Sequence, residues 1–173
     1  KGHYPRHRHA ELWRSWKGYK AGTFDGEKMY ELMVTGLAGM KEKRVKRLAR
    51  TYFNTVHKNR VYRPMVELVS SLERVGLVPW VVSGSPKWVV AAGARRLGIP
   101  ERRVIGLAVE VDAQGRLTDR VVRPVPWKRG KAKRILSDVG QAPVLAAGNS
   151  HGDIDMLRIS AETPLVINPG PKV

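Results

Sequence analysis

The sequence predicts an α/β fold with a doubly wound parallel sheet, and a small helical cap placed before this core. Two observations support this prediction. From Tyr62 onward, short apolar runs of strand length alternate with helix-length segments, the pattern of parallel strands joined by helices. Before Tyr62, helical patterns follow one another with no strand between them. We therefore divide the chain into a basic helical cap region, residues 1–60, and an α/β core, residues 61–173.

The cap region contains two clear helical patterns. The first covers residues 27–35 and ends at Gly36, and the second covers residues 41–58 with apolar side chains at three- and four-residue spacing in a basic coat. Residues 1–24 mix basic and aromatic side chains without a period, so helix and loop both remain open there.

The core is predicted to alternate helix and strand. Pro64 suits the first helical position, and Gly76, Gly98 and Gly140 each follow a helical pattern as a stop signal. A glycine-containing turn at 112–116 joins two short strands into a hairpin. We expect helices over 65–75, 86–97 and 131–139, strands over 77–82, 104–108, 108–111, 117–122, 144–147 and 165–167, and a loop at 83–85.

The chain is strongly basic. Its 32 Lys and Arg against 15 Asp and Glu give a net charge of +17, and residues 1–60 alone hold fifteen of the basic residues and five of the acidic ones, a net of +10. Such a charge attracts polyanions, but a solvated arginine-rich surface, or a segment separated from an acidic partner sequence, is the favoured explanation. Nucleic acid and anionic membranes therefore stay open as partners but are not favoured.

The composition also bears on location. There is no cysteine, which excludes a disulfide partner and fits a reducing compartment. No apolar run approaches transmembrane length, and no secretory segment is present. We expect a cytoplasmic protein, with any leader upstream of Lys1. The oligomeric state is not indicated.

The segment Gly148–Leu157, GNSHGDIDML, is the most informative motif. It follows an apolar strand, and the carboxyl ends of strands are where open α/β sheets bind ligands. The side-chain oxygens of Asn149 and Asp153 suit a hard cation such as Mg²⁺, whereas no His/Cys cluster points to zinc. The alternative is a plain turn in which Asp153 caps the following helix.

Two further segments fall at comparable positions. Ser83 and Gly84 come at a strand end immediately before a helix start, where a hydroxyl and free N–H groups can hold a phosphate-sized anion; the alternative for Ser83 is a helix cap. Lys131 stands at a helix start, where its charge opposes the helix dipole and suggests a compensating anion. The alternative is an exposed lysine without a function.

In this order, the three segments resemble the second, third and fourth motifs of the haloacid dehalogenase (HAD) superfamily, most closely its phosphoserine-phosphatase-like branch, subfamily IB. The resemblance extends from about Gly36 to Pro169. It implies a HAD-type phosphatase, a Mg²⁺-dependent hydrolase that cleaves a small organic phosphomonoester through an aspartyl-phosphate intermediate.

The resemblance also implies roles for individual residues. Ser83 would bind the transferring phosphoryl group with help from the Gly84 backbone, and Lys131 would neutralise charge between the nucleophile and the phosphoryl oxygens. Asp153 would hold the metal shell directly or through a hydrogen bond. Asn149 stands where many relatives have Asp, so it could ligate Mg²⁺ only through a neutral carbonyl.

One family motif has no match. The nucleophile normally lies in Asp-x-Asp-x-Thr after the first strand, and Asp25 in Thr23–Gly26 is only a superficial echo, because no apolar strand precedes it. We expect the chain to start downstream of this motif, so that the first strand is absent and the fragment alone is inactive. In the family this strand lies between those ending at Ser83 and Gly148, which predicts either a gap or a direct pairing there.

A second class of function remains open. The chain could be a non-catalytic basic binding module that uses a HAD-like fold to contact nucleic acid or anionic lipid through residues 1–60. For the enzyme, the phosphate ester is not specified: serine, choline-like, sugar and lipid phosphates all remain candidates.

Overall fold

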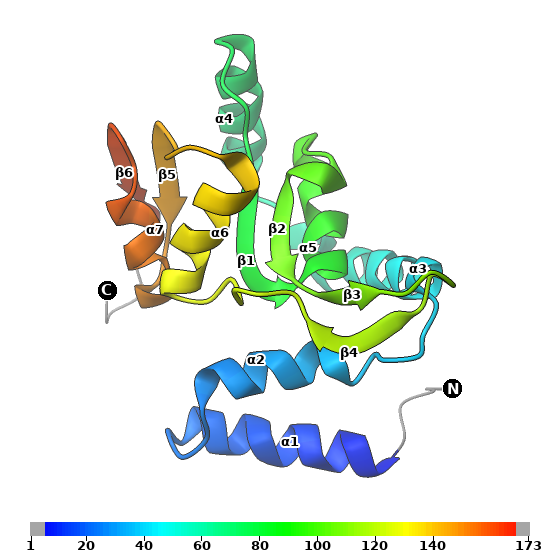
Figure 1. The fold of residues 1–173 in the computed structure, drawn as a ribbon. Coiled ribbons are helices and arrows are strands. Elements are labelled where there is room, and N and C mark those ends of the chain that lie inside the picture. The colour runs from blue at the N-terminus through cyan, green and yellow to red at the C-terminus, as the bar shows by residue number, and fades with distance from the viewer. Residues whose placement is uncertain (1–5, 169–173) are drawn as a thin grey trace.

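The computed structural model describes residues 6–168 and begins with a helical segment (Figure 1). Helices α1 (Arg6–Lys20) and α2 (Gly26–Thr35) run side by side in opposite directions. Helix α3 (Glu42–Tyr52) continues into a π-helical turn, η1 (Phe53–His57), and a 3-10 turn, η2 (Lys58–Arg60). The helical patterns at 27–35 and 41–58 are thus confirmed, the second with a change of helix type after Tyr52.

The remainder alternates helices and strands, as the pattern predicted. The elements are α4 (Arg63–Arg74), β1 (Val81–Pro86), α5 (Lys87–Ala94), η3 (Arg95–Leu97), η4 (Glu101–Arg103), β2 (Val104–Leu107), β3 (Val109–Val111), β4 (Leu117–Val121), α6 (Arg129–Val139), β5 (Leu145–Gly148), η5 (His151–Asp153), α7 (Ile154–Arg158) and β6 (Thr163–Val166). Gly76, Gly98 and Gly140 follow their helices with φ of 85°, 80° and 84°, a conformation that favours glycine and ends a helix.

The described strands form three pairs. Strands β1 and β2 are parallel, β5 and β6 are parallel, and β3 and β4 form the antiparallel hairpin. Across residues 6–168, β1 and β5 share no backbone pairing. This agrees with the expected gap rather than with a direct pairing, although the identity of a missing strand stays a prediction.

Side chains join the two parallel pairs. Ile135 of α6 packs in one buried cluster with Ile105 of β2 and Ala146 of β5, and Val82 of β1 lies against the same cluster. Apolar packing therefore joins the β1–β2 pair to the β5–β6 pair, although the described strands of the two pairs share no backbone hydrogen bond.

The cap helices share a core with the α/β part. Val34 of α2 and Val45 of α3 belong to the same buried cluster as Trp88, Leu107 and Leu117. Trp88 also donates from its indole N–H to a carboxylate oxygen of Glu42, at 3.2 Å. A domain boundary at residue 60 therefore stays a prediction, because residues on both sides of it pack together.

Two strand positions differ from expectation. The strand expected at 77–82 lies at Val81–Pro86, because Val81 and Val82 pair with Val104 and Ile105 and a register shift then carries the extended backbone on to Pro86. The expected loop at 83–85 is thus part of β1. The last strand, expected at 165–167, begins two residues earlier and ends one residue earlier, at Thr163–Val166.

None of the helices within residues 6–168 combines the length and the apolar character that crossing a bilayer requires.

Candidate functional site

The three segments singled out in the sequence lie at one edge of the fold. Strands β1 and β5 run in the same direction, and their carboxyl ends point to the side where α6 begins (Figure 1). The α1–α2 hairpin lies across this side. This edge therefore combines strand ends, a helix start and a covering pair of helices, the arrangement in which α/β proteins bind ligands.

The central contact is an ion pair between Lys131 and Asp153. The Lys131 ammonium at the start of α6 donates to Oδ1 of Asp153; the Asp153 side chain is buried, with 6% of its surface exposed, and that of Lys131 is largely buried, with 12% exposed. The carboxylate supplies the compensating negative charge that the position of Lys131 predicted.

The second oxygen of Asp153 organises the loop after β5. Oδ2 accepts hydrogen bonds from the backbone N–H of Asn149 at 3.1 Å, from the backbone N–H of Ser150 at 3.0 Å and from the Ser150 hydroxyl at 2.7 Å. Ser150 and Asp153 also form a capping box at the start of η5. The carboxylate thus fixes the loop from one side and Lys131 from the other.

These contacts decide the charge of Asp153. Burial alone would raise its pKa, but the hydrogen bonds from Lys131 and Ser150, the lysine charge and the Asn149 N–H outweigh burial, so the pKa lies below its ordinary value. Asp153 is therefore ionised at neutral pH, and the pair with Lys131 is a pair of charges.

Glycines allow the close approach of these segments. A Cβ at Gly148 would lie 2.5 Å from the Cβ of Asp153, and a Cβ at Gly130 would lie 1.8 Å from the Val125 carbonyl oxygen. Both glycines are thus required by space rather than by a positive φ. The glycines before Lys131 and Asn149 in the sequence motifs have this physical reason, whereas a Cβ at Gly152, beside Asp153, would meet only Ser150 Oγ, at 3.5 Å.

The Ser83–Gly84 segment lies near the same edge. The Ser83 hydroxyl accepts from the backbone N–H of Ser85 at 3.1 Å, which leaves its own proton free for donation to an anion. A Cβ at Gly84 would lie 2.9 Å from the Tyr30 ring and 3.4 Å from the Pro126 carbonyl oxygen. The described contacts join Lys131 to Asp153 directly, whereas Gly84 is linked to this pair only through Tyr30, which lies against Gly84 and senses the charge of Asp153. The described hydrogen bonds do not join Ser83 to the pair.

Tyr30 of α2 is a site residue that the sequence did not reveal. Burial, the neighbouring Tyr19 and the charge of Asp153 raise the pKa of Tyr30 to about 12, so its hydroxyl stays protonated. Its ring centre lies 6.2 Å from that of Tyr19 and 5.8 Å from that of Trp127. Tyr19 and Tyr30 of the cap and Trp127, just before α6, therefore form an aromatic wall beside Gly84. The aromatic content of residues 1–24 could have pointed to Tyr19, but no local signal pointed to Tyr30.

Asp25 is placed as a helix cap. Its Oδ1 accepts from the backbone N–H of Lys28 at 2.8 Å, at the start of α2. This contact explains the Thr23–Gly26 sequence without a chemical role for the carboxylate.

Asn149 and Asp153 alone do not fit a Mg²⁺ site. Both oxygens of Asp153 already accept hydrogen bonds, and the part of the chain that the structure describes contains no group of three His, Cys, Asp or Glu side chains suited to a metal ion. Mg²⁺ requires a near-octahedral set of oxygen ligands, usually with one or two carboxylates. Of the two predicted ligands, only the exposed Asn149 has a side-chain oxygen that accepts no hydrogen bond in the described part of the chain.

Comparison with known proteins identifies a family whose model matches most of the chain. The family model of haloacid dehalogenase-like hydrolases matches residues 3–158. No curated protein matches the sequence significantly.

Solved structures share the fold. A protein of unknown function from Bordetella pertussis Tohama I is 22% identical with a TM-score of 0.78, over 96% of this chain and 75% of that one. A probable phosphoserine phosphatase from Vibrio cholerae is 20% identical with a TM-score of 0.68, over 94% of this chain and 49% of that one. A HAD family hydrolase from Salmonella enterica serovar Typhi is 14% identical with a TM-score of 0.63, over 94% and 54%. The chain thus spans about half the length of the last two.

Proposed function

Since the chain belongs to the haloacid dehalogenase-like hydrolase family, we propose that it forms the phosphate-binding part of a phosphatase that hydrolyses a small phosphomonoester. The observation that carries the proposal is the buried pair of Lys131 and Asp153 beside the loop after β5. A buried ammonium held at a fixed point is costly unless its charge is used or compensated, and at this edge it can serve a bound phosphoryl group as well as its partner.

The chemistry of Lys131 supports this role. An ammonium has three N–H donors, and the bond to Asp153 uses one of them. The others can donate to phosphoryl oxygens, and because Asp153 fixes the ammonium beforehand, little reorganisation is needed as negative charge develops. Ser83, whose hydroxyl proton is not used by Ser85, is proposed as a second donor.

The proposed reaction has two steps. An aspartate oxygen attacks phosphorus as the bond to the alcohol breaks, and the alcohol leaves with a proton; water then attacks the phosphorus, and phosphate and the free carboxylate are released. We propose that this aspartate lies on a strand between β1 and β5 and is not one of the 173 residues. The missing backbone pairing between these strands supports that placement.

Mg²⁺ dependence of the complete enzyme is part of the proposal. Asn149 would contribute a neutral oxygen, and Asp153 would act by shaping the loop, as its hydrogen bonds allow. When bound, the ion would offset the negative charge of phosphate and carboxylates. Water, phosphate oxygens of the substrate and a carboxylate outside the described part of the chain would supply the remaining ligands.

The substrate is proposed to be a small phosphorylated molecule. Its leaving group would meet the wall formed by Tyr19, Tyr30 and Trp127. The cysteine-free composition supports a cytoplasmic location as a further proposal.

Phosphate release tests the proposal. The full-length protein would be incubated with serine, choline, sugar and lipid phosphates, with Mg²⁺ or with EDTA. We expect release from at least one ester with Mg²⁺, and a loss of roughly 10²-fold in Lys131→Ala. Lys133→Ala, an exposed lysine on the same helix, is the matched control. No release from any ester, or equal effects of the two substitutions, would refute the proposal.

A further inference from the structure

A basic groove lies apart from the site described above. Three cavities of about 380, 400 and 370 Å³ adjoin one another along α3, η1 and η2 on one side and α5 and η3 on the other. The first and second share Arg50 and Arg95, and the second and third share Arg96. None of the three is lined by Lys131 or Asp153. We call this continuous feature the arginine groove.

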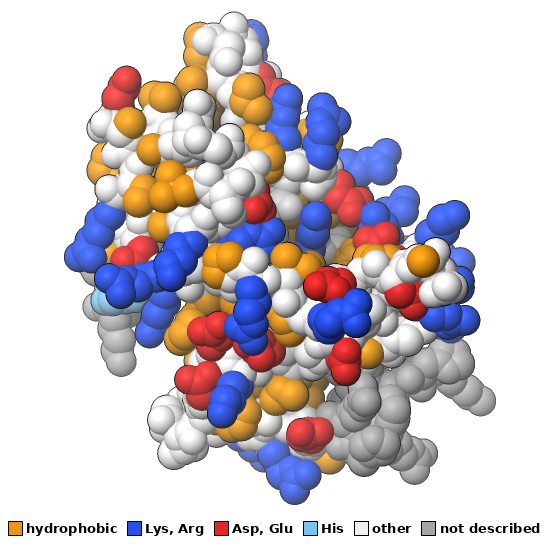
Figure 2. All heavy atoms as spheres, viewed as in Figure 1, with side chains coloured by type: hydrophobic (Ala, Val, Ile, Leu, Met, Phe, Trp, Pro, Cys, Tyr) orange, Lys and Arg blue, Asp and Glu red, His pale blue; other side chains and the backbone are white. Residues whose placement is uncertain are grey.

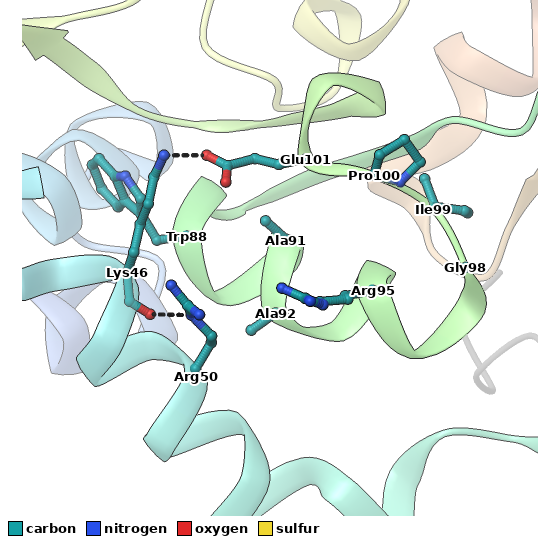
Figure 3. A pocket seen from close by; sticks show the side chains of 10 residues that line it. All are labelled: Lys46, Arg50, Trp88, Ala91, Ala92, Arg95, Gly98, Ile99, Pro100 and Glu101. Atoms are coloured by element: carbon teal, nitrogen blue, oxygen red, sulfur yellow. Dashed lines mark hydrogen bonds and ion pairs between the residues drawn. The ribbon is translucent and has the colours of Figure 1, made fainter. Parts of the chain in front are cut away.

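Arginines dominate its middle. The second cavity is lined by three arginines, one asparagine and one alanine, without a carboxylate: Arg50, Arg95, Arg96, Asn54 and Ala92. Figure 3 shows the Arg95 side chain extending towards Arg50, with Ala92 beside them. Two positive charges therefore converge over a small side chain that leaves room for a ligand.

These arginines have no acidic partners in the described part of the chain. Arg50 donates to the backbone carbonyl of Lys46 at 3.4 Å, and Arg96 donates to the amide oxygen of Asn54 at 3.0 Å. Neither of them, nor Arg95, forms an ion pair within residues 6–168. Converging like charges repel one another, and an anion between them would remove this cost.

Two carboxylates contact Lys46 at the first end of the groove. Lys46 pairs with Glu101 at 2.8 Å (Figure 3) and with Glu42 at 3.3 Å. One cation faces two acids at this end, a net charge of −1, and the three arginines lie further along the groove, without an ion pair in the described part of the chain.

We propose that the arginine groove binds the phosphate backbone of a single-stranded nucleic acid. Guanidinium groups bind phosphate oxygens through paired N–H donors, which is why arginine is common where phosphate is recognised. Because Arg50, Arg95 and Arg96 are shared between adjoining cavities, successive phosphates can be bound along one line, as a chain of phosphates requires.

Other features of the groove favour this ligand. Tyr62 follows Val61 of the third cavity and is 69% exposed, so its ring is available for stacking by a base. On the face shown in Figure 2, Lys and Arg side chains also gather along the edge near α3, which would steer a polyanion towards it. A membrane surface, in contrast, binds a convex helical face with apolar side chains to insert, whereas these arginines line a recess.

Fluorescence anisotropy with a labelled single-stranded RNA or DNA of 20 nucleotides, titrated over a range of salt concentrations, tests the proposal. The variant Arg50→Gln/Arg95→Gln/Arg96→Gln of the full-length protein should bind at least about tenfold more weakly and lower the slope of log K against log salt by about 2, the value for three lost phosphate contacts. The control Arg14→Gln/Lys133→Gln/Arg158→Gln removes the same charge from exposed positions elsewhere and should change binding less than about threefold.

Further variants keep the test decisive if the Gln triple variant fails to fold. Lysine at the same three positions should keep the salt slope and weaken binding, because lysine lacks the paired donors. Tyr62→Ala should weaken binding without changing the slope. The proposal is overturned if the groove and control variants weaken binding equally, if neither nucleic acid binds, or if the protein binds vesicles of phosphatidylserine and phosphatidylcholine but no nucleic acid.

Discussion

Lys131 and Asp153, 22 residues apart in the sequence, form a buried ion pair that joins the start of α6 to the loop after β5. Asp153 uses its second oxygen to accept three hydrogen bonds from Asn149 and Ser150. One carboxylate therefore sets both the position of the lysine and the shape of the loop.

Breaking this pair from either side should destabilise the protein. Lys131→Met leaves a buried carboxylate without its cation, and Asp153→Asn leaves a buried ammonium without its anion, so we expect each to cost about 3–5 kcal/mol. The double variant should cost less than the sum of the two, because no buried charge remains. Denaturant unfolding of the four proteins measures the coupling. Additive losses would show that the pair contributes nothing as a pair.

Gly148 should not tolerate a side chain. In Gly148→Ala the new Cβ would meet the Asp153 side chain at 2.5 Å, and we expect a loss of about 1–3 kcal/mol. Gly152 is the matched control, because in Gly152→Ala the nearest atom would be the Ser150 hydroxyl at 3.5 Å. We expect that substitution to stay within about 0.5 kcal/mol of the parent by thermal unfolding. Equal losses in the two variants would remove the steric explanation.

Acid should weaken the loop through Asp153. Since contacts in the folded protein lower its pKa, ionised Asp153 contributes stability above the unfolded value of about 3.9, and this contribution is lost as pH falls below that value through the lowered pKa. Asp138, whose pKa is also lowered, adds its own acid dependence. The measurement is therefore the difference in unfolding free energy between the parent and Asp153→Asn. It should shrink as the pH falls below the unfolded value of about 3.9, and a constant difference would argue against the role.

Asn149→Asp tests the proposed ligand. The substitution adds one negative charge at the proposed ligand position, so Mg²⁺ should bind more tightly to the complete enzyme if the side chain is a ligand. Calorimetric titration with Mg²⁺ provides the comparison. Unchanged affinity would indicate that Asn149 only shapes the turn.

The sequence predicted the helices of the core well because local signals govern them. Gly76, Gly98 and Gly140 occupy the left-handed conformation after a helix that their positions indicated. Strand β1 was displaced by several residues because its pairing with Val104 and Ile105, not its own apolar run, decides where the extended backbone lies.

For the site, motif order indicated Lys131 and Asp153 but not how they are used. The three hydrogen bonds to one oxygen of Asp153 depend on how the loop folds back on η5. Tyr30 was missed because its contact with Gly84 joins segments more than fifty residues apart, and no local pattern records such a contact.

The source of the nucleophile is the central claim, and one measurement tests it most directly: Mg²⁺-dependent phosphate release by residues 1–173 alone, beside the same chain extended by its upstream coding sequence. We predict no turnover by residues 1–173, because Lys131 and Ser83 can bind a phosphoryl group but neither is an attacking carboxylate, and we predict turnover by the extended protein. Robust turnover by residues 1–173 that Asp25→Asn abolishes would contradict the account and make Asp25 the nucleophile.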